Sequence, residues 1–290
     1  MSVVYVLGNA GLDLSLGMAR LPAPGETLVA HTATRGPGGK GLNQAVTAGR
    51  AGADVIFTAP VGDDREAEQL RAVLATEPLI FEPISLAYPT DLSVIMVTPG
   101  GENSIATVGL AADGLDVAAA ERFAGRAGPD DWLLLQGNLS LAATRAAMLA
   151  TQARVIFNTA PLRWPVDDLL PLCDLVIANG VEAADITGAQ GADAAQRLLA
   201  LGARSVIITL GREGAILASD GTLILMPAPA VTAVDTTGAG DTLCGVLAAA
   251  LARGDTVRQA LQRGQDAAAV TVTRPGAYAA LPSRAELSRP

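Results

Sequence analysis

The chain has 290 residues, enough for one large domain, and because 50% of them are apolar and only 3% aromatic, the core must be built from Ala, Val, Leu and Ile. Its net charge of −9, without any basic run, argues against a nucleic-acid partner, since phosphate backbones are bound through clustered Lys and Arg. One histidine, His31, and two distant cysteines, Cys173 and Cys244, cannot form a metal-ligand cluster, and both cysteines are expected to be buried free thiols.

The N-terminal part begins with a strand and then becomes irregular. Val3–Leu7 is a continuous apolar run, typical of a strand buried on both faces. Residues 9–36 contain Gly, Pro and alternating stretches such as 27–32, which favour exposed strands over a helix. Asp13 follows the first strand closely, either as a turn-forming residue or at the strand end where α/β proteins bind ligands.

A glycine-rich segment comes next, at residues 36–41, and it contains the only lysine of the chain, Lys40. Its four glycines let the backbone approach a ligand closely, and Lys40 and Asn43 add donors. The segment is not a Walker loop, because Gly41 stands where Ser or Thr should follow the lysine. By itself it is either a flexible loop or a ligand cradle. A helix is predicted over 42–51, ending at Gly52.

The middle of the chain departs from strand–helix alternation. After a strand at 54–59 and a helix at 65–75, residues 79–97 alternate, with 92–97 the clearest strand. Gly100 and Gly101 predict a turn into a strand at 103–108, which makes a hairpin. No helix intervenes, so we expect the segments at about 14–34 and 88–108 to pair into a small sheet over the active site.

From residue 131 the alternation returns, with strands predicted at 132–136, 154–158, 175–178 and 206–209 beside Ala/Leu-rich helices. These spacings favour a parallel sheet flanked by helices. Polar residues follow the strands: Asn138, Asn158, Asn179 with Glu182, and Thr209. Each alone would be an ordinary cap or turn residue, but together they predict a cleft along one edge of the sheet.

The stretch 234–242 is the most informative part of the chain. A β-branched run at 231–234 leads into glycines and then into an apolar helix over 242–252, too short to cross a bilayer. Free amides and the positive end of the helix dipole make such a loop an anion site. Asp241 is either a first-turn Asp that favours the dipole, or a general base beside a phosphate held by the amides of 239–241.

Two ordered motifs resemble one family. Asp-Thr-Thr-Gly-Ala-Gly-Asp-Thr at 235–242 is similar to the C-terminal signature of the ribokinase-like (PfkB-type) family of ATP-dependent sugar and nucleoside kinases, and Gly-Gly-Lys-Gly-Leu-Asn-Gln-Ala at 38–45 to its N-terminal motif. The similarity continues at 62–64, 179–182, 209–211 and 281–282. It implies a three-layer α/β fold in a single domain, 1–290, with a mainly parallel central sheet, a β-sheet lid, and a homodimer formed through the lid.

The resemblance also implies a site. Asp241 matches the catalytic base, assisted by Gly238, Ala239 and Gly240. Substrate-binding positions are matched by Gly11, Asp13, Gly38, Gly39, Lys40, Gly41, Asn43, Asn138 and Asp241. Two of these depart from ribokinase: Gly11 replaces a sugar-binding Asn, and Asn138 replaces a Glu that receives hydrogen bonds from ribose.

Nucleotide-binding positions are matched by Asn179, Glu182, Thr209, Leu210, Gly211, Arg212, Glu213, Gly214, Gly240 and Gln265. Glu182 would organise Mg²⁺ through water. A potassium site is matched by Asp235, Thr237, Thr271, Arg274, Gly276 and Ala280, where Ala280 replaces a Ser oxygen. The cofactors implied are therefore ATP, Mg²⁺ and K⁺.

The function expected from this resemblance is transfer of the γ-phosphate of Mg-ATP to a primary hydroxymethyl group of a small sugar. Ribose is the leading candidate for this sugar. Another sugar or a nucleoside is the alternative substrate, and a non-catalytic sugar-binding protein is the alternative class. A dinucleotide-dependent oxidoreductase is disfavoured, because residues 8–11 lack the Gly-x-Gly-x-x-Gly spacing. No signal peptide precedes the first strand, so we expect a cytoplasmic protein without a membrane partner.

Overall fold

The computed structural model describes residues 2–99, 103–219 and 221–288. Within them, one large sheet contains nine strands. In spatial order these are β15 (Thr222–Met226), β14 (Ala215–Ser219), β13 (Ser205–Thr209), β12 (Leu175–Asn179), β11 (Arg154–Asn158), β10 (Trp132–Gln136), β1 (Val3–Leu7), β4 (Asp54–Thr58) and β6 (Ile80–Phe81). The pairs from β6 to β13 are parallel, and β14 and β15 continue the sheet as antiparallel strands.

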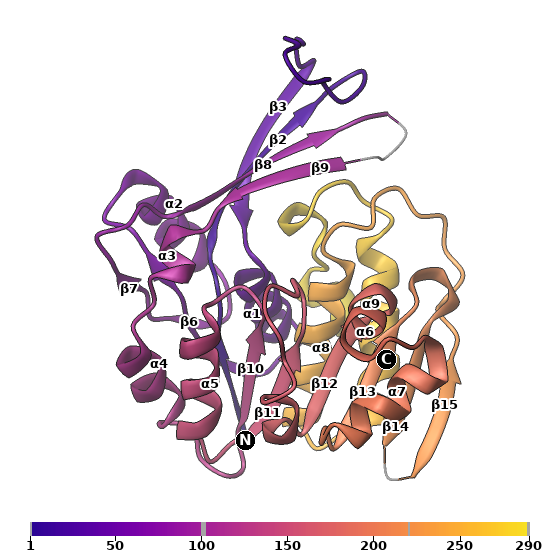
Figure 1. Cartoon of the computed structure of the whole chain (residues 1–290). Coiled ribbons are helices and arrows are strands. Elements are labelled where there is room, and N and C mark those ends of the chain that lie inside the picture. Colours follow the sequence, from indigo (N-terminus) through magenta and orange to yellow (C-terminus); the bar gives the residue numbers. More distant parts are fainter. Residues whose placement is uncertain (1, 100–102, 220, 289–290) are drawn as a thin grey trace.

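Helices cover both faces of this sheet, because its central strands are apolar on both sides. In β1, Val4 and Val6 belong to one hydrophobic core, and Tyr5 and Leu7 to the other. The first core is closed by α1 (Lys40–Arg50), α2 (Arg65–Leu74), α8 (Ala239–Ala252) and α9 (Val257–Thr271). The second is closed by α4 (Val117–Ala124), α5 (Leu141–Ala150), α6 (Gly180–Thr187) and α7 (Gly191–Ala200). The predicted three-layer α/β fold is confirmed (Figure 1).

A separate sheet rises above one end of the core (Figure 1). Its strands, in order, are β3 (Thr32–Gly38), β2 (Gly11–Gly17), β8 (Asp91–Val97) and β9 (Asn103–Val108). The two segments that were expected to pair do so through the parallel β2–β8 ladder. The remaining short elements are β5 (Pro60–Val61) with β7 (Ile84–Ser85), α3 (Leu110–Asp113), α10 (Arg284–Leu287), and the 3₁₀ turns η1 (Leu170–Leu172), η2 (Gly211–Glu213) and η3 (Tyr278–Ala280).

Several local predictions were wrong. The alternating stretch 27–32 is not a strand before Thr32, because β2 ends at Gly17 opposite Thr32 and the chain between them, 18–31, belongs to no strand ladder. The glycine segment is not a loop throughout, since residues 36–38 complete β3 and α1 already begins at Lys40. Residues 231–234 form no strand, and the β14–β15 hairpin was not predicted. The turn expected at Gly100 and Gly101 lies outside the described residues.

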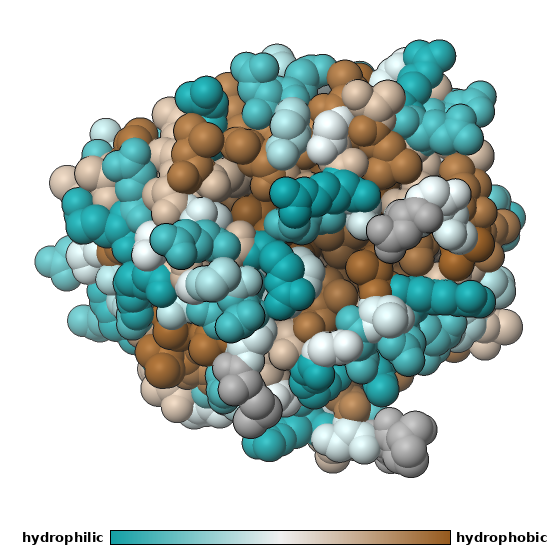
Figure 2. Space-filling view, turned by 90° about the horizontal axis from the view of Figure 1, so that it is seen from below, coloured by the Kyte–Doolittle hydropathy of each residue, from teal (hydrophilic) through white to brown (hydrophobic). Residues whose placement is uncertain are grey.

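The end of the molecule away from the small sheet mixes hydrophilic and hydrophobic side chains on its surface (Figure 2). None of the described helices combines the length and the apolar character needed to cross a bilayer. Cys173 and Cys244 are free and buried, as predicted.

Candidate active site

The N-terminus of α8 forms the centre of the site. Gly238 caps it with a left-handed φ of 79°, a conformation that L side chains adopt only under strain. The Ala239 N–H already donates to the Thr236 carbonyl at 3.3 Å, so the helix end offers mainly the amides of Gly240 and Asp241. A Cβ added at Gly240 would meet no atom within 4 Å, so this backbone faces open space where a ligand can approach.

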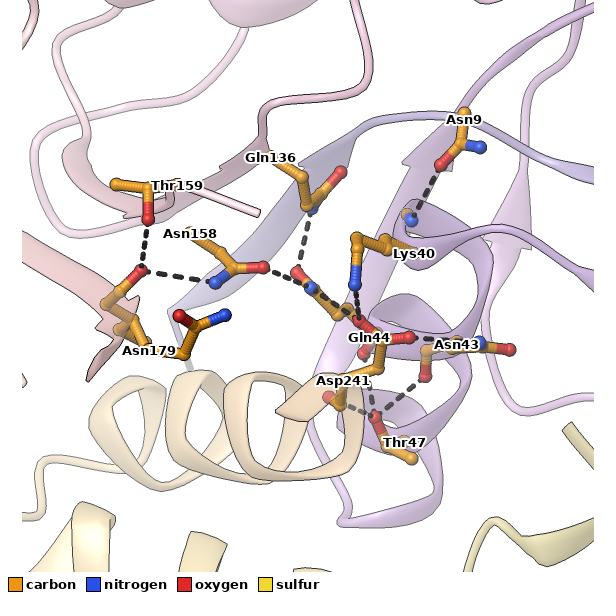
Figure 3. A network of polar contacts seen from close by, with 12 residues as sticks. Asn9, Lys40, Asn43, Gln44, Thr47, Gln136, Asn158, Thr159, Asn179 and Asp241 are labelled. Carbon is orange, nitrogen blue, oxygen red and sulfur yellow. Dashed lines mark hydrogen bonds and ion pairs between the residues drawn. The ribbon is translucent and has the colours of Figure 1, made fainter. Parts of the chain in front are cut away.

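Asp241, in the first turn of α8, is only 6% exposed, and α1 supplies the partners of its carboxylate (Figure 3). Asn43 Nδ2 donates to Oδ2 at 3.1 Å and Gln44 Nε2 donates to Oδ1 at 3.0 Å. Lys40 Nζ lies 3.9 Å from Oδ1. The C-terminal motif and the glycine motif, about 200 residues apart, therefore meet at one carboxylate. Gln44 was not predicted, although it stands inside the glycine motif.

Lys40 begins α1 and remains 37% exposed at its side chain. The negative charge of Asp241 raises the pKa of this ammonium above its usual value, although burial opposes the shift and Glu182 adds a smaller favourable effect. A positive charge therefore lies beside the Asp241 carboxylate.

Asp13, on β2, lies beside the same group. Burial is the main reason that the pKa of its carboxyl rises to about 6, and the charge of Asp241 adds to the rise while a hydrogen bond from Ser93 opposes it. Gly38 lies directly against this carboxylate, because a Cβ there would come 2.3 Å from Asp13 Oδ2. The four-stranded sheet thus contributes Asp13, and the adjoining α1 contributes Lys40 and Asn43, to one site.

The other predicted sugar positions have distinct surroundings. Gly39 and Gly41 pack on the backbone of Asn9, where a Cβ would come within 2.9 Å and 2.8 Å of its carbonyl oxygen. Gly11 faces β8, where a Cβ would meet the Asp91 carbonyl oxygen at 2.3 Å, so the position admits no side chain without movement of a strand. Asn138 follows β10, and its buried Oδ1 has no hydrogen-bond partner in the described chain. An unpaired buried acceptor is unusual in a folded protein, and this makes Asn138 a candidate ligand position.

Most of the predicted nucleotide residues lie at the ends of β12 and β13, whereas Gly240 is on α8 and Gln265 is on α9. Asn179 caps α6 in a reciprocal capping box with Glu182, whose Oε2 also accepts from Thr159 Oγ1 at 2.8 Å. Leu210–Gly214 form a tight turn closed by the Leu210 N–H and the Gly214 carbonyl at 2.8 Å. Gln265, on α9, donates to the Met226 carbonyl at 3.1 Å, and its buried Oε1 has no partner in the described chain.

Asp235 connects two of the other predicted potassium residues, Thr237 and Gly276. Its Oδ1 accepts from the Thr237 N–H and hydroxyl, and its Oδ2 accepts from the Gly276 N–H at 2.8 Å. Burial works against ionisation of Asp235, but these donors outweigh it and hold its pKa below the usual range. The Thr271 carbonyl accepts the Arg274 N–H at 3.1 Å, and Ala280 is fully buried. No group of three or more His, Cys, Asp or Glu suited to a metal ion occurs among the described residues.

The profile of the pfkB family carbohydrate kinases matches residues 1–284, nearly the whole chain. The chain belongs to this family of kinases. Among curated relatives of this pfkB-family kinase, the ribokinase of Haemophilus influenzae is 32% identical over 292 residues, which cover 97% of this chain and 95% of the relative.

Solved structures agree with the family assignment. The Thermotoga maritima ribokinase superposes with a TM-score of 0.90 at 30% identity, covering 99% of this chain and 98% of that one. The Arabidopsis thaliana ribokinase complexed with ribose and ATP superposes with a TM-score of 0.83 at 27% identity, covering 99% and 97%. This pfkB-family kinase is accordingly a phosphotransferase that acts on a sugar hydroxyl, as its motifs predicted.

Proposed function

We propose that the chain transfers the γ-phosphate of ATP to a primary hydroxymethyl group of a small sugar, with ribose as the first candidate. The observation that carries the proposal is the meeting of two distant motifs at Asp241, which is buried at the N-terminus of α8 and contacted by Lys40 and Asn43 of α1. A buried carboxylate beside free amides and a fixed cation is what in-line phosphoryl transfer requires.

Asp241 accepts the proton of the sugar hydroxyl as that oxygen attacks phosphorus. The amides of Gly240 and Asp241 face the charge that develops on the transferring group. Lys40 adds a positive charge next to the carboxylate and remains protonated, because Asp241 raises its pKa. Asp13 accepts a hydrogen bond from one of the other sugar hydroxyls, and Asn43 donates a hydrogen bond to another. The sugar is therefore held with its reacting hydroxyl in one orientation.

The choice of ribose follows from similarity to ribokinases, one of which is described as complexed with ribose and ATP. Two substrate-binding positions of this chain differ from the ribokinase pattern. Gly11 cannot present a hydrogen-bonding side chain, and Asn138 presents a neutral amide where a carboxylate is expected. Since a missing hydrogen bond to a hydroxyl changes preference by roughly 1–3 kcal/mol, a second sugar or a nucleoside is the alternative substrate.

Magnesium would bind mainly through the phosphates of ATP, with Glu182 ordering its water ligands. Potassium would be held by the Asp235 carboxylate and the carbonyls of Thr237, Thr271, Arg274 and Gly276. The low pKa of Asp235 fits a cation, whereas Ala280 supplies no side-chain oxygen. Bound beside the start of α8, the ion would add positive charge near the transferring phosphate.

We further propose that the whole chain acts as one domain in which the four-stranded sheet is a lid, and that the lid supports a homodimer. Leu92 on β8 and its cross-strand partner Val108 on β9 are exposed apolar side chains on one face of the sheet, which a second lid would cover.

A panel of pentoses, hexoses and nucleosides tests this function. The protein is incubated with Mg-ATP in KCl or NaCl, and ADP release and the phosphorylated product are followed. We expect ribose to give the highest kcat/KM and KCl to increase the rate. Absence of ADP release with every member of the panel would contradict the kinase function, and a better substrate than ribose would correct only its specificity.

Asp13→Asn is expected to raise the KM for the sugar about 10- to 100-fold with a smaller change in kcat, because an ionised acceptor of hydroxyl protons is replaced by a weaker one. The pKa of about 6 lies above the ordinary 3.8, so folding disfavours the ionised form and stability falls as pH rises from about 4 to 6. The variant should therefore melt at a higher temperature than the wild type at pH 8 and at a similar one at pH 4.

Asp54→Asn, at the exposed start of β4, is the control and should leave the sugar KM and the melting temperature unchanged. A sugar KM for Asp13→Asn equal to that of the wild type would remove Asp13 from the binding site.

A further inference from the structure

Gln44, on the second turn of α1, lies next to the proposed catalytic carboxylate, where α1 and α8 meet (Figure 3). Its side chain is fully buried, and it makes three side-chain hydrogen bonds. Nε2 donates to Asp241 Oδ1 at 3.0 Å and to Asn158 Oδ1 at 3.3 Å, while Oε1 accepts from Gln136 Nε2 at 2.9 Å. Both N–H groups of the amide and one of its acceptor positions are therefore used.

The direction of this network is determined by groups that can only accept. The Asp241 carboxylate requires a donor from Gln44. At the other end, Asn158 Nδ2 donates to the Ile177 carbonyl at 3.1 Å, which turns Asn158 Oδ1 toward Gln44. A flipped Gln44 amide would direct its oxygen at two acceptors and its nitrogen at the Gln136 donor. Only one orientation of Gln44 satisfies all three neighbours.

We propose that Gln44 is a positioning residue that fixes the orientation of the Asp241 carboxylate from the sheet side by donating a hydrogen bond to Oδ1. The proposal rests on the proposed function, in which Asp241 is the base. Asn43 holds the other carboxylate oxygen, Oδ2, and is itself a predicted sugar ligand. Gln44 instead connects Asp241 to β10 and β11 through Gln136 and Asn158, so it supports the base independently of the sugar.

Other titratable groups also act on this site. Lys40 of α1 lies 3.9 Å from Asp241, and Asp13 of β2 and Cys244 of α8 interact electrostatically with it. Glu182 of α6 acts on Lys40 and Cys244. Because Asp13 titrates near pH 6, measurements of kcat at saturating sugar are needed to separate its effect on sugar binding from the effect of Gln44 on the base.

The test is Gln44→Leu. We expect kcat to fall about 10- to 100-fold because the carboxylate is no longer held in its reactive orientation, with the sugar KM nearly unchanged. The acidic limb of the pH profile of kcat should move about one unit to higher pH, since an N–H donor to the ionised carboxylate is lost. Gln262→Leu is the matched control, because Gln262 Nε2 donates to Asp266 Oδ1 at 3.0 Å on the exposed face of α9.

Gln136→Leu provides a second test that leaves Gln44 in place. It removes the donor to Gln44 Oε1, so this buried oxygen loses a partner and the side chain is held less firmly, although Asp241 and Asn158 still determine which way the amide faces. We expect the acidic limb to move in the same direction by a smaller amount. In the Asp241→Asn background, Gln44→Leu should cause little further loss of kcat, because the two residues act as one unit.

The outcomes of these experiments distinguish the positioning role of Gln44 from the proposed kinase function. If the wild type phosphorylates sugars and Asp241→Asn is inactive, but Gln44→Leu keeps the wild-type kcat and pH profile, the positioning role is wrong and the proposed function stands. A loss of kcat and melting temperature in Gln44→Leu without a shift of the acidic limb would show a structural role only, and would also overturn the proposal. A wild type without kinase activity would refute the proposed function itself.

Discussion

Asp241→Asn is expected to lower kcat at least about 100-fold, and up to about 10⁴-fold, because the amide cannot accept the proton of the attacking hydroxyl. The KM values for sugar and ATP should change much less, since Lys40, Asn43 and the helix amides remain in place. The measurement is steady-state phosphorylation of the best substrate of the panel, with sugar binding determined separately by calorimetry.

The loss in Asp241→Asn should come from chemistry and not from unfolding. The carboxylate accepts from Asn43 at one oxygen and from Gln44 at the other, and an asparagine can accept at only one of these positions. Asn43 can compensate, because among the described residues its buried Oδ1 has no partner, and a flip of its amide would place this acceptor opposite the new amide nitrogen. The fold should therefore tolerate the substitution.

Asp266→Asn is the control, since Asp266 also accepts from a glutamine but lies exposed on α9. It should keep the wild-type rate. A turnover of Asp241→Asn within a few-fold of the wild type, at a confirmed substrate, would refute Asp241 as the base and would require another acceptor for the hydroxyl proton.

Much of the core was predictable from local sequence. The strands Trp132–Gln136, Arg154–Asn158 and Asn103–Val108 have the predicted bounds, because each is a short run of apolar or alternating residues bounded by turn residues. Pairing was harder to predict. Ala215–Ser219 is an equally apolar run, but nothing in its residues indicates that it folds back antiparallel on β13 without a crossover helix. Local patterns predict strands better than they predict strand neighbours.

The candidate site also contains residues that local sequence predicts and residues whose role depends on the tertiary structure. Asp241 and Lys40 could be predicted because a glycine segment at a helix start has chemical consequences that can be read locally. Gln44 could not, since its role depends on Gln136, Asn158 and Asp241, which lie 92, 114 and 197 positions away in the chain. A buried amide acquires its function from partners that only the tertiary structure brings together.

Gly245→Ala is expected to cause the second large loss, because Gly245 lies where α8 crosses α1. A Cβ at this position would come 2.0 Å from Thr47 Oγ1 and 2.3 Å from the Gln44 carbonyl oxygen, so the helices must separate. Overpacking of this kind costs about 1–3 kcal/mol in the free energy of unfolding. Separation also moves Asp241, one turn earlier on α8, away from its donors on α1, so kcat should fall by about 100-fold or more.

Thermal unfolding and kcat measured on the same preparations test this coupling between packing and catalysis. Gly128→Ala is the control, since Gly128 lies between α4 and β10, at the other end of the sheet from the site, and a Cβ there would come no closer than 3.7 Å to Asp131 Oδ2, so neither quantity should change. Thr47→Ala in the Gly245→Ala background should restore part of both losses, because it removes the hydroxyl that the new methyl group meets first, whereas the Gln44 carbonyl remains. If Gly245→Ala matched the wild type in stability and rate, close contact between α1 and α8 would not be what holds the carboxylate against its donors.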